Sequence, residues 1–338
     1  MPAPFASFRA AGMVVVLGLA WPAAGCSSEP DTEPSDAGRP VTSATASAET
    51  VPDFPVAGVE SRQQARLVMP GGPDWLVADT AGVWVKRDSG YVDLVDPATT
   101  EVVRSVEVGG DLCQGIGAGF GAIWTCSGTD VVRVDPQSGE VTARLPLNKA
   151  FEQGNLATGF DRLWVLIGDG STLAGVDPAS GTVTTTVDLG VRGTDLGVGA
   201  AGLWVASKPD DTVVRVDPDR AEVMVEVGDI DSPVAVSVTD EVWIGAAAST
   251  VRLDPATGEP VTTSPIGTGG YGGLAVTRDA VWVRSPNRFL VRLDPSDGRA
   301  VEGFTADTPS GGSVLVAFGS VWATAFDDDV LFRVRPTG

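Results

Sequence analysis

Carboxylates are the side chains of this sequence with the greatest capacity for chemistry, because the chain holds 44 acidic residues, 23 basic residues and no histidine. Histidine is the commonest general base near neutral pH and the commonest transition-metal ligand, so its absence weakens many reaction classes. Two carboxylates can act together as acid and base, yet no pair stands out from the surplus of aspartates, and no serine lies in a recognisable nucleophile motif. The sequence therefore predicts no catalytic residue and no metal site.

Four aspartates lie at or near loops that lead into short strands rich in Gly, Ala and Val. They are Asp74, Asp111, Asp195 and Asp231. Gathered on one face, they would form an acidic mouth that attracts a cationic peptide, a polyamine or Ca²⁺. In a chain of net charge −21, acidic loops also serve solubility alone, and both interpretations stay open. No cofactor is predicted, because nothing beyond charge favours Ca²⁺.

Two aromatic residues, Trp75 and Tyr271, lie in segments of the same kind. Tyr271 is one of two tyrosines and is surrounded by glycine in Gly269–Gly273, with a similar Gly311-Gly312 loop further along the chain. Aromatic rings over glycine-lined backbone suit sugars or peptides, so both residues are candidate ligand contacts. The alternative, that these loop aromatics merely cap the core, has equal weight.

A repeat with a period of about 40 residues supplies the elements that position these side chains. Seven tryptophans recur at intervals of 39 or 40 residues, each after a β-branched residue or leucine. They are Trp84, Trp124, Trp164, Trp204, Trp243, Trp282 and Trp322. Seven copies at one mid-strand position favour packing between repeats over cofactor stacking.

Each repeat contains four short strands and no predicted helix, which is the pattern of one propeller blade. An Asp-Pro turn follows six of the seven tryptophans by 11 to 13 residues, and Asp-Pro is typical of hairpin turns. The last repeat lacks an outer strand, and the segment 65–69 before the first blade supplies one, which closes the ring and removes a free edge. We therefore predict an all-β fold, a monomeric seven-bladed β-propeller over 63–338. In a closed ring Trp75 and Tyr271 would flank one pocket.

Cys113 and Cys126 are expected to form a disulfide. Cys113 enters the inner strand of the second blade and Cys126 leaves its second strand, so the two face each other across a hairpin centred at Phe120-Gly121. An exported protein meets the oxidising compartment that this bond needs. Two buried free thiols are the alternative.

The first 25 residues resemble a bacterial lipoprotein signal peptide. A single charge at Arg9 precedes an apolar run, and Ala23-Ala24-Gly25-Cys26 matches a lipobox with Cys26 as the lipidated residue. An ordinary secretory signal cleaved near Gly25 is the alternative. The acidic Ser/Thr/Pro-rich range 26–62 is expected to be a disordered tether, so the chain is predicted to be exported and anchored at the extracytoplasmic face of the cell membrane.

The repeat unit G-x-V-W-V followed by V-x-R-V-D-P-x-T-G resembles the bacterial propellers of the YVTN, NHL-like and virginiamycin B lyase-like group. The resemblance implies the fold and leaves function open, because the group includes surface binding proteins, sensor domains and a few enzymes. Its lyase members use a metal with histidine and glutamate at the central channel, and this chain has no histidine for those roles.

We predict a non-catalytic binding or scaffold module for an envelope protein, a peptide or a glycan. The alternative is an enzyme with its site in the channel, either a carboxylate-based hydrolase or lyase or a quinoprotein-like oxidoreductase. Nucleic acid is not expected as a partner, because a net charge of −21 repels it.

Overall fold

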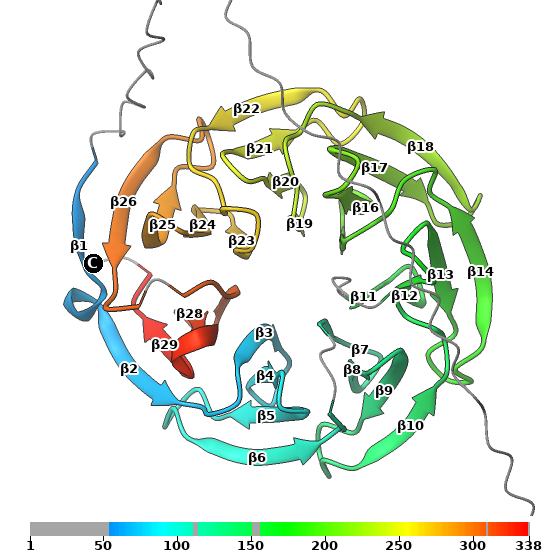
Figure 1. The fold of residues 1–338 in the computed structure, drawn as a ribbon, viewed down its shortest axis with the longest axis horizontal. Helices are drawn as coiled ribbons and strands as arrows, with labels where there is room; N and C mark the ends of the chain where they lie inside the picture. Colours follow the sequence, from blue (N-terminus) through cyan, green and yellow to red (C-terminus); the bar gives the residue numbers. More distant parts are fainter. Residues whose placement is uncertain (1–53, 111–113, 151–155, 309, 337–338) are drawn as a thin grey trace, which may run out of the picture. The chain divides into compact units, whose positions relative to one another are not determined.

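The computed structural model describes residues 54–110, 114–150, 156–308 and 310–336. Within these ranges, seven β-sheets stand around a common axis as the blades of a propeller (Figure 1). The predicted all-β, seven-bladed fold is confirmed. Neither of the two short 3-10 helices nor any other helical segment of the described residues is long and apolar enough to cross a bilayer.

Each blade is built on four antiparallel strands, which in blades one to six run in chain order from the axis outward. Blades one to three consist of β3 (Pro73–Ala78), β4 (Val83–Arg87), β5 (Tyr91–Val95) and β6 (Val102–Glu107); β7 (Ile116–Gly119), β8 (Ala122–Ser127), β9 (Asp130–Val134) and β10 (Val141–Leu145); and β11 (Leu156–Gly159), β12 (Arg162–Ile167), β13 (Thr172–Val176) and β14 (Val183–Asp188).

The remaining four blades follow the same plan. They consist of β15 (Asp195–Gly199), β16 (Gly202–Ser207), β17 (Thr212–Asp217) and β18 (Glu222–Val227); β19 (Ala235–Val238), β20 (Val242–Gly245), β21 (Thr250–Leu253) and β22 (Pro260–Ser264); β23 (Leu274–Thr277), β24 (Ala280–Ser285), β25 (Arg288–Leu293) and β26 (Ala300–Thr305); and β27 (Val314–Ala317), β28 (Ser320–Ala325), β29 (Val330–Val334) and β2 (Gln63–Val68).

The seven repeated tryptophans lie in the second strand of each blade and are at most 1% exposed. Each packs against the next blade, as Trp84 does against Ile123 and Val132. Trp322 of blade seven packs against Val83 of blade one, which completes the ring. The predicted packing role of these residues is confirmed, and large buried aromatics of this kind dominate the energetics of packing.

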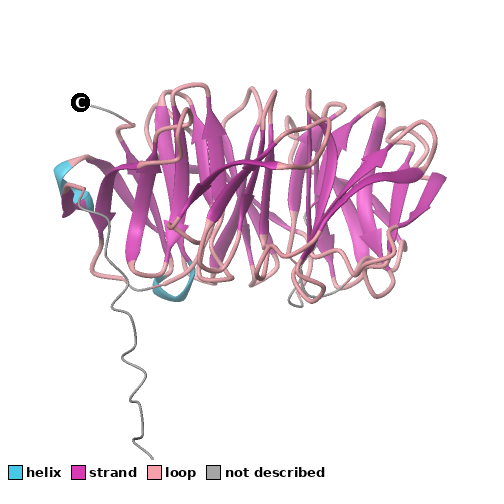
Figure 2. Cartoon of the chain, turned by 90° about the horizontal axis from the view of Figure 1, so that it is seen from above, coloured by secondary structure: helices cyan, strands magenta, loops and turns pink. Residues whose placement is uncertain are grey.

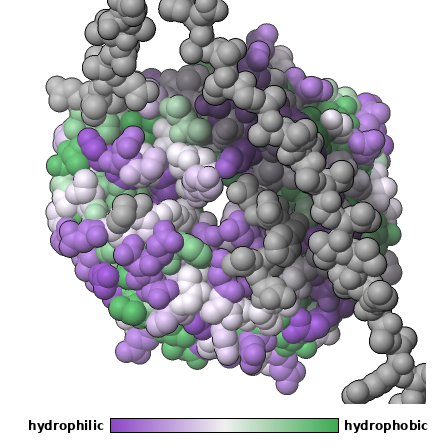
Figure 3. All heavy atoms as spheres, viewed as in Figure 1, coloured by the Kyte–Doolittle hydropathy of each residue, from purple (hydrophilic) through white to green (hydrophobic). Residues whose placement is uncertain are grey.

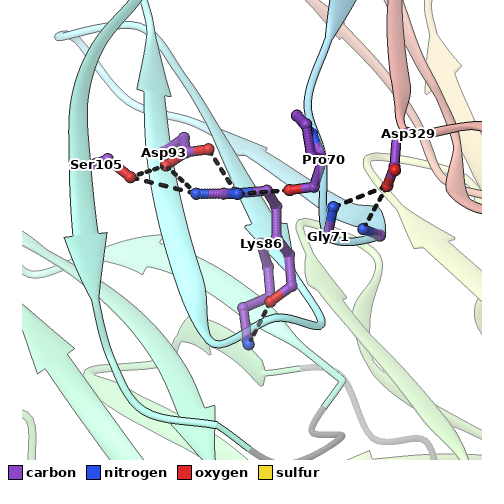
Figure 4. Close-up of polar contacts among 8 residues, drawn as sticks. Pro70, Gly71, Lys86, Asp93, Ser105 and Asp329 are labelled. Carbon is purple, nitrogen blue, oxygen red and sulfur yellow. Dashed lines mark hydrogen bonds and ion pairs between the residues drawn. The ribbon is translucent and has the colours of Figure 1, made fainter.

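Ring closure follows the predicted strand exchange. β2 pairs antiparallel with β29, with Arg66 opposite Phe332. The N–H groups of Gly71 and Gly72 then donate to Oδ1 of Asp329 at 2.8 and 2.9 Å (Figure 4). The chain thus passes from the outer edge of blade seven to the inner strand of blade one while its backbone donors stay paired.

An additional strand lies in the range 26–62, which was expected to be a disordered tether. β1 (Val56–Gly58) pairs parallel with β26 and adds a fifth strand to blade six, and the 3-10 helix η1 (Val59–Ser61) follows it. Val59 is fully buried, and Arg62 forms an ion pair with Glu302 at 2.8 Å. The folded unit therefore begins before residue 63, and the range 26–62 is too long for the tether. Residues 1–53, with the predicted signal peptide and Cys26, lie outside the described residues.

The blades present two different faces at the ends of the strands (Figure 2). One carries the Asp-Pro turns, in which aspartates such as Asp135 accept hydrogen bonds from the two N–H groups that follow the proline. These backbone hydrogen bonds hold the pKa of Asp135 below its usual range. The other face carries the loops that lead into the inner strands and the turns between second and third strands, and we call it the inlet face.

Candidate binding cavity at the inlet face

A cavity of about 640 Å³ lies at the axis of the ring and is lined by inlet-face segments of six blades. Viewed along the axis, the space-filling surface is hollowed at its centre (Figure 3). The lining combines the inner strands β3, β19, β23 and β27 with the glycine-rich loops before β23 and β27. Inner strands of all seven blades converge at the axis, and the mostly small side chains of β19, β23 and β27 leave it open.

Four of the six predicted ligand contacts line this cavity. Asp74 and Trp75 lie on β3, Asp195 opens β15, and Tyr271 lies in the loop before β23. Asp231 does not belong to the lining and is exposed on the loop before β19. Asp111 lies outside the described residues. The pocket flanked by Trp75 and Tyr271 is therefore present, whereas the acidic mouth does not include Asp231.

Asp195 is the most deeply buried carboxyl group of the cavity, with 4% of its surface exposed. Its Oδ2 accepts a hydrogen bond from the N–H of Val236 at 2.8 Å, and its Oδ1 has no hydrogen-bond partner among the described residues. Burial raises the pKa of Asp195 to about 7, against the opposing effect of the N–H groups of Val236 and Leu196. A buried acceptor without a partner costs free energy unless something else pairs with it.

Asp74 lies on the same cavity wall as Arg284. Burial raises the pKa of Asp74 to about 7, repulsion from Asp88 adds to this effect, and attraction to Arg284 opposes it. The side chain of Arg284 is 2% exposed and donates to the carbonyl oxygens of Phe289, Ser310 and Thr324. Its Nε has no hydrogen-bond partner among the described residues. Arg284 thus joins blades six and seven and leaves one donor unsatisfied.

The three lysines of the chain all lie on the inlet face, a gathering that no sequence pattern predicted. Lys86 and Lys149 are at most 1% exposed, and each donates to the carbonyl of the residue that follows it, at 3.0 and 3.1 Å. Burial, with repulsion from Lys86, lowers the pKa of Lys149 to about 8. Lys208 donates to the carbonyl of Gly270 and lies 4.3 Å from the centre of the Tyr271 ring.

The described lining of the cavity holds three carboxylates and one guanidinium. With the lysines near it, the mouth is therefore mixed in charge rather than purely acidic. The repeat contains a pattern from which two of the buried cations could have been found. Two residues after the tryptophan, blades one and six carry Lys86 and Arg284, where the other blades carry small or apolar residues, Cys126, Leu166, Ala206, Gly245 and Thr324. A charge at a buried repeat position indicates a local function, because the fold does not require it.

The glycine loops before β23 and β27 contact each other directly. Gly272 and Gly312 form an isolated parallel bridge, and the N–H of Gly273 donates to the carbonyl of Gly312 at 3.0 Å. A Cβ at Gly272 would stand 2.3 Å from the carbonyl oxygen of Arg284, so only glycine fits there. The close approach holds the loop in place and leaves the Tyr271 side chain 77% exposed at the rim.

The predicted disulfide falls partly outside the described residues. Cys126 is fully buried in β8, and Cys113 precedes the described part of blade two. The bond between them stays a prediction. Within the residues that the structure describes, no three His, Cys, Asp or Glu side chains are placed to hold a metal ion.

Comparison with solved structures identifies other propellers. Virginiamycin B lyase from Staphylococcus aureus superimposes with a TM-score of 0.67 and 13% identity, covering 81% of this chain and 99% of the other. The β-propeller domain of Cps50 (Swd1) from Myceliophteria thermophila gives a TM-score of 0.67 and 12% identity with the same coverage. No protein-family model and no curated protein sequence matches the chain. At this level of identity, the comparisons establish that the chain shares the β-propeller fold of these proteins.

Proposed function

We propose that this protein is an exported, lipid-anchored propeller that binds a ligand in the inlet-face cavity without transforming it. The observation that carries the proposal is a set of unsatisfied polar atoms on the cavity wall. Nε1 of Trp75, Oδ1 of Asp195 and Nε of Arg284 are buried and lack hydrogen-bond partners among the described residues. Buried polar groups are nearly always paired in native proteins, so two donors and one acceptor in one cavity favour a ligand that pairs with them.

The size of the cavity limits what it takes. Small-molecule sites occupy ~300 to 1,000 Å³, and about 640 Å³ lies in the middle of that range. A glycan or peptide would insert one or two units, and a protein of the envelope would insert a loop or a chain end. The exposed Tyr271 ring at the rim would contact the part of the ligand that stays outside.

Arrays of glycans and peptides test this proposal, with the full chain as the probe and affinities measured for each hit. Tyr271→Ala should weaken binding of a hit at least fivefold, because the ring is the exposed aromatic of the rim. Phe318→Ala is the matched control, since this residue is also exposed but lies in the turn between β27 and β28, on the opposite face. Equal effects of the two substitutions would contradict a site at the inlet face.

A second candidate function rests on the two carboxyl groups whose pKa burial raises to about 7. Asp74 and Asp195 line the same cavity, and carboxyl groups of this kind serve as general acids and bases. A hydrolase or lyase would turn over a bound array hit at neutral pH. The variants Asp74→Asn and Asp195→Asn would abolish such turnover, whereas a binding protein returns every hit chemically unchanged.

A further inference from the structure

We infer that the cavity takes an organic ammonium, a ligand whose positively charged amine pairs with Oδ1 of Asp195. This inference rests on the proposed function and specifies its ligand class. The acceptor belongs to a residue that is more than nine-tenths buried and lines the cavity, and it has no partner among the described residues. An ammonium supplies both the missing donor and the missing counter-charge.

Neutral and anionic ligands suit the cavity wall less well than an ammonium does. A neutral hydroxyl would pair with the oxygen but leave an uncompensated charge on a buried carboxylate, which is costly. An anion would be repelled by the three lining carboxylates, Asp74, Asp195 and Asp327. Arg284 does not attract an anion effectively, because its two terminal nitrogens already donate to three backbone carbonyls.

The protein already holds one ammonium on this side of the mouth. Nζ of Lys208 lies over the ring of Tyr271 at 4.3 Å and donates to the carbonyl of Gly270. The N–H of Lys208 also donates to Oγ1 of Thr194, the residue before Asp195, so the two sites are neighbours. Aromatic faces with carbonyl oxygens are a common environment for ammonium groups, and the rim of the cavity that Asp195 lines provides one.

The pairing makes binding depend on pH. Because burial holds the pKa of Asp195 near 7, an ammonium that requires the ionised carboxylate displaces a proton below that pH. The strands that pack against β15, which are β11, β16 and β19, carry no charged side chain. The other charges of the cavity wall are Asp74, Arg284 and Asp327. Affinity should rise about tenfold per pH unit up to pH 7 and then level off.

Calorimetric titration of the full chain tests the inference with three probes of one shape, phenethylamine, 2-phenylethanol and 3-phenylpropionate. We expect the amine to bind at pH 8 at least tenfold more tightly than the alcohol or the acid. At pH 6 its affinity should fall about tenfold, with up to one proton released per amine bound. That proton appears as a difference in heat between phosphate and Hepes buffers.

The variant Asp195→Asn should lose at least tenfold in amine affinity and most of the pH dependence, the remainder coming from Asp74 on the same wall. Asp240→Asn, at an exposed aspartate on the opposite face, is the matched control and should bind like the parent. Equal binding of the three probes, or no amine binding up to 10 mM, would overturn the ammonium inference. The glycan and peptide arrays test the proposed function independently of this inference. A neutral or acidic ligand found there would support binding in the cavity but contradict an ammonium as the ligand.

Discussion

The carboxyl group of Asp195 should destabilise the folded protein above neutral pH, and Asp195→Asn should relieve this cost. Folding raises the pKa of Asp195 from 3.8 to about 7, so between these values the folded state holds a proton that the unfolded state has released. Stability therefore falls as pH rises through this window, by ~1.4 kcal/mol per unit. The cost is absent below pH 4 and reaches ~4 kcal/mol above pH 7.

Asparagine has the shape of aspartate and can keep the hydrogen bond from the N–H of Val236, but it does not ionise. We expect Asp195→Asn to be more stable than the parent by about 2 to 4 kcal/mol at pH 8, because its amide leaves part of the pairing unsatisfied. At pH 4 the two proteins should differ little. Asp74 titrates in the same window in both proteins, so its contribution cancels from the difference.

Urea denaturation at pH 4, 6 and 8, followed by tryptophan fluorescence, measures these differences. Asp240→Asn is again the control and should stay within about 0.5 kcal/mol of the parent at each pH, as exposed positions usually do. A stability difference between Asp195→Asn and the parent that does not change with pH would show that the carboxyl group is not held protonated. The assignment of a desolvated carboxylate to this cavity would then be wrong.

Three further predictions concern the N-terminal region and the cysteines. A chain that starts at Gln63 lacks Val59 and should unfold at a lower free energy than one that starts at residue 53, by ~2 to 3 kcal/mol, because the burial of that valine is lost. A chain that starts at Pro70 should lose cooperative unfolding because blade seven lacks β2. Calorimetry distinguishes the three chains. Cys26→Ser should move the protein from the detergent phase to the aqueous phase, and a variant that stays in the detergent phase contradicts lipidation. Mass spectrometry without reduction should find Cys113 and Cys126 joined by a disulfide, and alkylation of both thiols would refute the bond. In the chain-entropy model this bond would stabilise the folded protein by ~3 kcal/mol.

The plan of seven blades with four antiparallel strands each could be predicted because it repeats. A tryptophan recurs every 39 or 40 residues, and an Asp-Pro turn follows six of the seven. Each unit therefore predicts the same four strands, and seven copies of one pattern do not arise by chance. The strand exchange that closes the ring was predictable for a related reason. The last repeat lacks its outer strand, and a strand without a hairpin partner precedes the first repeat. Pairing these two segments completes the last blade and leaves no free edge.

β1 could not be predicted, because its pairing does not depend on a side-chain pattern. Only three residues long, it pairs through backbone groups with the outer edge of β26, and its side chains are exposed. Its polar, proline-containing surroundings are typical of a flexible segment. The burial of Val59, which packs in one cluster with residues of blades six and seven, exists only when those blades are in place.

The candidate site, like the fold, was predictable from the sequence only in part. From the sequence alone, the repeat determined that inner-strand loops share a face, which brought Asp74, Trp75, Asp195 and Tyr271 together as candidates. Only the tertiary structure decided that Asp195 is buried with its Oδ1 unpaired among the described residues, while Asp231, in an equivalent type of loop, is exposed. Periodicity specifies which strand and face a residue occupies, but burial and pairing depend on neighbours from other blades, and those neighbours meet only when the ring closes.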